Sequence, residues 1–210
     1  TTYKGDRNDP QRHFCDMVAY ADKAVGQVVA QLEKSGVRDN TLIIFTGDNG
    51  TDTPIVTAWN GTKVVGGKGT MSDNGTRVPL IANWKAGIQK PGRVVDDLVE
   101  LTDMFPTISD VTGAKLPNDQ PTDGVSILPV LQNKADSREK DWIYIWYRKQ
   151  VMVRDKRYSL LANQDGSSAV LTRYIGPFDG KQLKDNKLTK YERVLKEQFE
   201  ATIARLAKTR

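Results

Sequence analysis

Hydrophobic residues recur at helical spacing near the start of the chain and then give way to one continuous apolar run. Asp9-Pro10 is typical of a helix start, and apolar side chains follow three or four positions apart as far as Leu32. Ser35-Gly36 is typical of a helix end. The run Thr41–Thr46 is apolar without alternation and rich in β-branched residues, which predicts a strand covered on both faces.

Residues 47–76 show little periodicity and are rich in Gly, Asn, Asp and Thr, which predicts one long loop. A loop of this length inside a compact domain is usually either functional or disordered. The elements expected after it are a strand over 77–84, a strand or short helix over 94–101, and a helix that Asp103 caps and that ends at Gly113.

The pattern changes beyond the polar segment 132–141, where short strands alternate with turn signals. A last amphipathic helix spans residues 188–206. We therefore expect an α/β protein: a layered sheet with flanking helices, plus a small C-terminal antiparallel four-stranded sheet with one helix. The expected domains are residues 1–134 and 135–210. The four predicted strands are Trp142–Arg148, Gln150–Arg154, Arg157–Ala162 and Ala169–Tyr174.

Composition narrows the range of partners. The 31 Lys and Arg against 26 Asp and Glu give a net charge of +5, but acids interleave with the bases, as on a solvated helix face. We therefore expect no nucleic-acid partner. No apolar run approaches the ~20 residues of a membrane-spanning helix, so no membrane span is expected. One cysteine, Cys15, excludes an internal disulfide.

The first candidate for chemistry is the segment Gly47-Asp48-Asn49-Gly50, directly after the apolar strand. Ligands of open α/β sheets bind at the carboxyl ends of strands. Asp48 and Asn49 offer a carboxylate and an amide oxygen, which suit a hard cation such as Ca²⁺ or Mg²⁺. The same four residues would also serve as a plain turn.

The second candidate is Lys68, inside Gly66-Gly67-Lys68-Gly69-Thr70. An ammonium group beside an oxygen-ligated cation would make a binding site for an anion such as phosphate or sulfate. The alternative is a solvated loop lysine.

Several segments resemble motifs of one known family. Residues 20–26 are similar to Y-x-D-x-x-V-G, residues 39–50 to DNT-hydrophobic-SDNG, and residues 68–79 to KG-xxx-EGG-x-RVP, with Asp73-Asn74 in place of Glu-Gly. Residues 101–108 and 123–126 match two further segments. The chain therefore resembles the sulfatase family of the alkaline-phosphatase-like superfamily over roughly residues 8–131.

The resemblance implies a hydrolase acting on sulfuric esters. Asp48 and Asn49 would be metal ligands, usually for Ca²⁺ with Mg²⁺ as the alternative, and Lys68 would contact the sulfate oxygens. The family's nucleophile is a formylglycine made in a C/S-x-P-x-R motif, and the residues around Cys15 lack both the Pro and the Arg. We therefore expect Cys15 to be a packing residue of the first helix, and His13 to be a surface residue at that helix's start.

Ligand counting also indicates an incomplete site. Ca²⁺ takes about 6–8 oxygen ligands, and Asp48 and Asn49 supply two or three. Asp52 and Asp73 are the other acids within residues 47–76. We expect the chain to be the C-terminal portion of a sulfatase, inactive alone, whose N-terminal half brings the nucleophile and the missing ligands.

Several expectations stay open beside this one. The substrate would be a sulfate-ester small molecule or a sulfated glycan, and the family resemblance implies a periplasmic, lysosomal or secreted location. Two alternative functions compete with sulfate-ester hydrolysis. One is a phosphoester or phosphonate hydrolase of the same superfamily, and the other is a non-catalytic module that binds anionic glycans.

Overall fold

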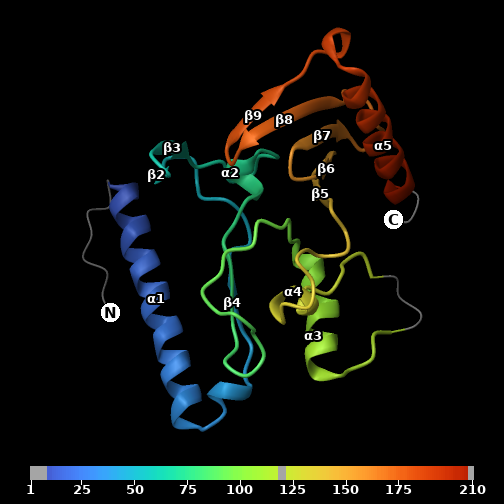
Figure 1. Ribbon diagram of the computed structural model, residues 1–210. Helices are drawn as coiled ribbons and strands as arrows, with labels where there is room; N and C mark the ends of the chain where they lie inside the picture. The colour runs from blue at the N-terminus through green and yellow to red at the C-terminus, as the bar shows by residue number, and fades with distance from the viewer. Residues whose placement is uncertain (1–8, 118–121, 208–210) are drawn as a thin grey trace. The chain divides into compact units, whose positions relative to one another are not determined.

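The helix predicted at the start of the chain forms as α1, Pro10–Lys34, in the computed structural model (Figure 1). The Asp9 side chain accepts a hydrogen bond from the Arg12 backbone N–H at 3.0 Å, as an N-cap should. Gly36, just beyond the helix, has a φ of 71°. The structure describes residues 9–117 and 122–207.

The first of two compact units covers residues 1–88. Its strands β1 and β4 pair antiparallel, with a register that runs from Ile43 opposite Asn83 to Thr46 opposite Leu80. A second strand pair, β2 and β3, precedes the short helix α2. The elements are α1, η1 (Arg38–Asn40), β1 (Ile43–Thr46), β2 (Val56–Trp59), β3 (Thr62–Val65), α2 (Asp73–Thr76) and β4 (Leu80–Asn83).

The apolar strand is confirmed, but its predicted burial on both faces is wrong. Phe45 is 38% exposed and Ile81, on the partner strand, is 57% exposed. Within the described residues β1 and β4 bond only to each other, so their sheet has two strands and leaves apolar side chains uncovered. The apolar face of α1 is similarly uncovered, and none of its residues is buried.

The loop predicted over residues 47–76 contains a β-hairpin, which is a correction. Strands β2 and β3 pair from Val56 opposite Val65 to Trp59 opposite Thr62. The turn between them is Asn60-Gly61, with φ values of 47° and 80°. Positive φ at both central residues is the geometry of a tight hairpin turn, and Asn-Gly is the sequence that adopts it most readily.

The second unit covers residues 89–210 and contains a five-stranded antiparallel sheet in the order β5-β6-β7-β8-β9. The four predicted strands are confirmed. The fifth, β9, was missed because its four residues are polar or glycine and all are exposed. The elements are η2 (Leu101–Asp103), α3 (Met104–Thr112), α4 (Leu128–Leu131), β5 (Ile143–Tyr147), β6 (Gln150–Arg154), β7 (Tyr158–Asn163), β8 (Val170–Gly176), β9 (Asp179–Gln182), η3 (Asp185–Lys187) and α5 (Lys190–Ala207).

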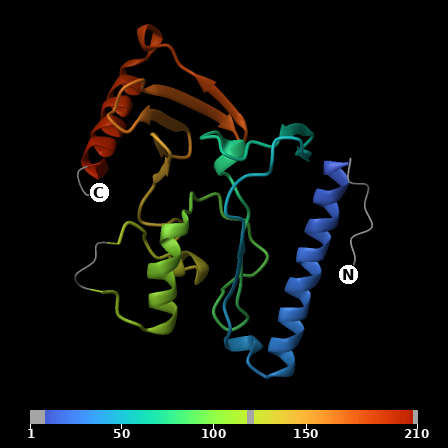
Figure 2. The same ribbon diagram turned by 180° about the vertical axis from the view of Figure 1, so that it is seen from behind.

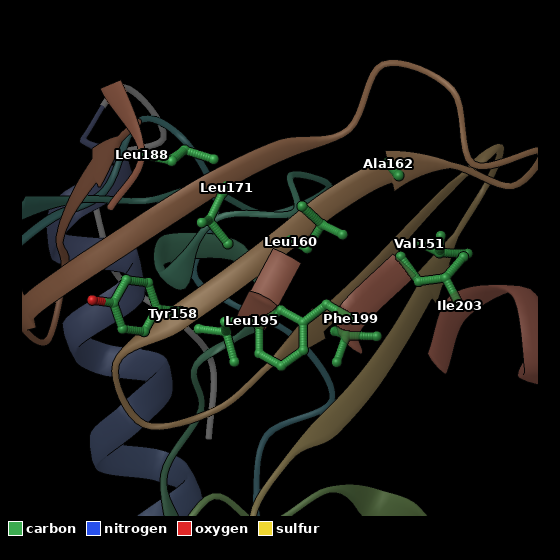
Figure 3. Packing of buried hydrophobic residues seen from close by; sticks show 10 residues of the cluster. Val151, Tyr158, Leu160, Ala162, Leu171, Leu188, Leu195, Phe199 and Ile203 are labelled. Atoms are coloured by element: carbon green, nitrogen blue, oxygen red, sulfur yellow. The ribbon is translucent and has the colours of Figure 1, made fainter. Parts of the chain in front are cut away.

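Helix α5 lies against one face of this sheet (Figure 2) and forms the main hydrophobic core with it. Leu195, Phe199 and Ile203 recur every four residues along α5 and point toward the strands (Figure 3). On the sheet side Leu160 and Leu171 are fully buried. The predicted amphipathic helix and the α/β class are therefore confirmed. No helix among the described residues has the length and apolar character that crossing a membrane requires.

Asp103 does not cap α3 with its side chain, contrary to the prediction. Its carboxylate accepts hydrogen bonds from the Glu100 N–H at 2.9 Å and from the Val125 N–H at 2.8 Å, and it pairs with Arg138 Nη1 at 3.1 Å. Both side chains of this ion pair are almost fully buried. A buried carboxylate is tolerated because charged and backbone donors satisfy it together.

The strand or helix predicted over residues 94–101 is also wrong: residues 94–100 form neither, and the short 3₁₀-helix η2 begins only at Leu101. The polar side chains of this segment bond elsewhere: Asp97 accepts from the Arg138 N–H at 2.7 Å, and Glu100 accepts from the Tyr144 N–H at 3.1 Å. These contacts join the segment to residues 138–144 without a strand ladder.

The start of α5 is a capping box formed by Thr189 and Glu192. The Glu192 carboxylate accepts from the Thr189 N–H at 2.9 Å, while the Thr189 hydroxyl accepts from the Glu192 N–H at 3.2 Å. The hydrogen bond from the Thr189 backbone lowers the pKa of Glu192, and Arg173, with Nη1 3.5 Å away, adds to the effect.

Replacing Glu192 tests this cap through its pH dependence. A carboxyl whose pKa is lower in the folded state stabilises the fold above its unfolded pKa of about 4.3, and this stabilisation disappears as the pH falls through the folded value. We expect Glu192→Gln to lower the free energy of unfolding in urea at pH 7, and the difference from the wild type to shrink below about pH 4. Glu200→Gln, on the same helix with a half-exposed carboxylate, is the control. An equal effect of Glu192→Gln at pH 7 and pH 3 would contradict the assignment.

Candidate active site

Asp48 and Asn49 lie where the chain leaves β1, between Gly47 and Gly50. Asp48 is exposed and Asn49 half-buried. The buried Gly50 donates its N–H to the Gly75 carbonyl at 2.8 Å, and a Cβ on Gly50 would stand 1.9 Å from the Asn74 carbonyl oxygen. A side chain at this position would overlap backbone, so only glycine permits the contact.

Lys68 lies in a tight turn of the glycine-rich segment that follows β3. The turn runs from Gly67 to Thr70, whose N–H donates to the Gly67 carbonyl at 2.9 Å, and Gly69 has a φ of 81°. The Lys68 N–H donates to the Thr51 carbonyl at 3.0 Å, and Thr51 is two residues beyond Asn49. The backbone of Lys68 is therefore bonded to the segment that carries Asp48 and Asn49, while the residue itself is exposed.

Further close contacts between the two segments exclude larger residues. A Cβ on Gly66 would stand 1.9 Å from the Asp52 carbonyl oxygen, and one on Gly67 would stand 2.6 Å from the Asn74 Cβ. The backbones of residues 47–52 and 66–75 thus form one assembly, which we call the interlocked loops. Asp48, Asn49 and Lys68 are all carried by this assembly, although they are spread over 21 positions of the sequence. Sequence reasoning missed the role of Thr51, which contributes only its carbonyl.

The candidate ligands are oxygen atoms, which a hard cation prefers, but they are too few to complete its coordination shell. Asp48 and Asn49 supply two side chains with oxygen ligands. Asp52 is exposed and accepts a hydrogen bond from the Thr53 N–H at 2.9 Å, whereas Asp73 is buried at the start of α2. Among residues 9–117 and 122–207, no three His, Cys, Asp or Glu side chains gather in a way that could hold a metal ion. These oxygens can contribute to a Ca²⁺ shell of about 6–8 ligands, and cannot fill one.

The two remaining candidates of the first helix lie on α1. Cys15 is exposed, so its assignment as a packing residue is wrong. The physical reason is that the described residues leave the apolar face of α1 uncovered. His13 is half-buried near the start of the same helix.

Comparison with protein families gives two overlapping matches. The model of the Sulfatase family matches residues 2–114, and the model described as N-sulphoglucosamine sulphohydrolase, C-terminal, matches residues 65–200. The first match covers more than half of the chain.

Individual relatives agree with these matches. Steryl-sulfatase of Mus musculus is 36% identical over 137 residues, covering 62% of this chain and 22% of its own length. An ulvan-active sulfatase of Formosa agariphila is 34% identical over 158 residues, covering 70% of this chain and 28% of its own. This chain thus spans about a quarter of the length of the curated relatives it matches.

A solved 2-O GAG sulfatase has a similar fold, with a TM-score of 0.68 and 24% sequence identity over 90% of this chain and 41% of its own. At this identity the likeness concerns the fold. It confirms the expected alkaline-phosphatase-like architecture.

Enlarging Gly75 should pull the interlocked loops apart. A Cβ there would stand 2.2 Å from the Thr70 carbonyl oxygen, and overpacking of this kind costs roughly 1–3 kcal/mol. We expect Gly75→Ala to lower the Tm and to reduce hydrogen-exchange protection of the Gly50 and Lys68 amides. Gly26→Ala, whose added methyl group meets open space on α1, is the control and should be neutral or stabilising. Wild-type protection of both amides in Gly75→Ala would contradict the description of these contacts.

Proposed function

Because this chain belongs to the sulfatase family, we propose that it forms part of an enzyme that hydrolyses sulfate esters, with Asp48, Asn49 and Lys68 in the active site. The proposal is supported most directly by the interlocked loops, which bring two hard oxygen donors and one ammonium group onto a single backbone assembly. A cation-assisted site for a sulfate group needs these two kinds of side chain close together.

In this proposal Asp48 and Asn49 bind a divalent cation through side-chain oxygens. The family is generally metal-dependent, and Ca²⁺, with Mg²⁺ as the alternative, is the ion that oxygen-only ligands favour. When bound, the cation supplies positive charge that attracts the sulfate group and polarises its oxygens. Asp48 is exposed and Asn49 is half-buried, so their side chains remain accessible for ligation.

In the same proposal, Lys68 contributes a second positive charge to the site. The sulfate group carries negative charge on its non-bridging oxygens, and further charge develops on the departing alcohol oxygen as the S–O bond breaks. A preorganised ammonium group offsets charge on these oxygens without having to reorient. The lysine side chain is flexible, but its backbone is fixed by the bond from its N–H to the Thr51 carbonyl. The fixed backbone limits the positions that the ammonium group can reach.

The remaining parts of the site are proposed to come from polypeptide outside these 210 residues. Two or three oxygens from this chain leave most of a Ca²⁺ shell to other ligands. The formylglycine nucleophile would likewise come from that polypeptide, since the surroundings of Cys15 lack the C/S-x-P-x-R pattern. We accordingly propose that the chain is inactive alone and that its protein partner is the N-terminal half of the same enzyme.

The substrate class and setting follow from the family and its relatives. We propose a sulfate-ester small molecule or a sulfated glycan as substrate, and a periplasmic, lysosomal or secreted location. Residues 1–134 would be the C-terminal part of the catalytic domain. Residues 135–210 would form a small α+β subdomain, which fits the separate core shared by the five-stranded sheet and α5.

Lys68→Ala in the full-length protein tests the proposed function. Removing one preorganised charge contact should lower kcat/KM for an aryl sulfate on the order of 10²-fold. Lys63→Ala, an exposed lysine on β3, is the matched control and should keep wild-type turnover. Near-normal turnover of Lys68→Ala would contradict the role of Lys68. Wild-type activity that is higher on an aryl phosphate than on the aryl sulfate would instead favour a phosphoester hydrolase.

A further inference from the structure

The peptide group in front of Lys68 is held at both of its polar atoms. Its N–H belongs to Lys68 and donates to the Thr51 carbonyl at 3.0 Å. Its carbonyl belongs to Gly67 and accepts from the Thr70 N–H at 2.9 Å and from the Thr70 hydroxyl at 2.7 Å. The side chain of Thr70 thus adds a bond to the atom that closes the lysine turn.

A second hydroxyl orients the first. Thr70 Oγ1 lies 2.8 Å from Ser72 Oγ. Each hydroxyl carries one proton, and the Gly67 carbonyl can only accept. Thr70 therefore donates to Gly67, and Ser72 donates to Thr70. The result is a directed chain of hydrogen bonds from Ser72 through Thr70 to the peptide group before Lys68.

Glycine makes this restraint necessary. Gly67 and Gly69 flank Lys68, and glycine gives the backbone more freedom than any other residue. Without cross-links, a turn of this composition would sample many backbone conformations and carry the lysine ammonium group with it. Thr70 is exposed, so its side chain supports no hydrophobic core, and the visible contribution of its hydroxyl is to this turn.

We propose that Thr70 is a positioning residue for Lys68, with Ser72 orienting its hydroxyl. The inference rests on the proposed function, in which Lys68 contacts the sulfate group. It extends that function to a residue that touches neither cation nor substrate and acts through the lysine.

The test compares Thr70→Val, which keeps the shape and loses the hydroxyl, with Thr70→Ser, which keeps the hydroxyl. Both are made in the full-length protein and assayed with an aryl sulfate. A single hydrogen bond makes a modest net contribution, so Thr70→Val should lower kcat/KM about two- to tenfold, while Thr70→Ser stays near the wild type. Thr202→Val on α5, which loses a hydroxyl bond to the Gln198 carbonyl, is the matched control and should keep wild-type activity.

Combining Thr70→Val with Lys68→Ala separates positioning from a general structural effect. If Thr70 acts through Lys68, its loss costs nothing further once the lysine is gone, so the double variant should match Lys68→Ala. Hydrogen exchange of the Lys68 amide gives a readout that does not depend on enzyme activity. Protection of this amide should fall in Thr70→Val and stay at the wild-type level in Thr70→Ser and Thr202→Val.

Each remaining outcome overturns a defined part of the account. Wild-type activity of Thr70→Val beside an impaired Lys68→Ala overturns the role of Thr70 and leaves the proposed function standing. An equal loss from Thr70→Val in the wild-type and Lys68→Ala backgrounds also overturns positioning. Wild-type activity of Lys68→Ala overturns the function of Lys68 and this inference together.

Discussion

Two glycine-containing segments of the candidate site approach each other so closely that their backbones bond directly, and the placement of the candidate residues depends on this contact. Gly50 donates to the Gly75 carbonyl and Lys68 donates to the Thr51 carbonyl, at 2.8 and 3.0 Å. Backbone bonds of this kind fix the positions of Cα atoms more tightly than contacts between flexible side chains do. Asp48 and Lys68 can therefore be exposed and Asn49 half-buried while hydrogen bonds hold the backbone segments that carry them.

The second unit is stabilised differently. Its core is an apolar contact between α5 and the sheet, and a buried Asp103–Arg138 ion pair joins the segment before α3 to the segment before β5. Neither feature carries candidate chemistry. The two units thus differ in their main interactions. Hydrophobic burial provides most of the stability of the second unit, while backbone hydrogen bonds shape the candidate site in the first.

Elements with strong local patterns were predictable from the sequence. The cap at Asp9, the apolar spacing of α1 and the bounds of β6 follow from local composition. The β2–β3 hairpin was missed although Asn60-Gly61 is a strong turn signal, and β9 carries no apolar pattern. The candidate residues Asp48, Asn49 and Lys68 could be selected by their chemistry. The backbone bonds that join their two segments, Lys68 to Thr51 and Gly50 to Gly75, could not be predicted, because side-chain patterns do not report backbone pairing.

The most direct test of the central claim is a crystal structure of the full-length protein with Ca²⁺ and sulfate bound, with the cation located by its anomalous scattering. We expect oxygens of Asp48 and Asn49 at about 2.3–2.6 Å from the cation, and Lys68 Nζ within about 3 Å of a sulfate oxygen. A cation bound elsewhere, or a Lys68 side chain directed away from the sulfate, would contradict it.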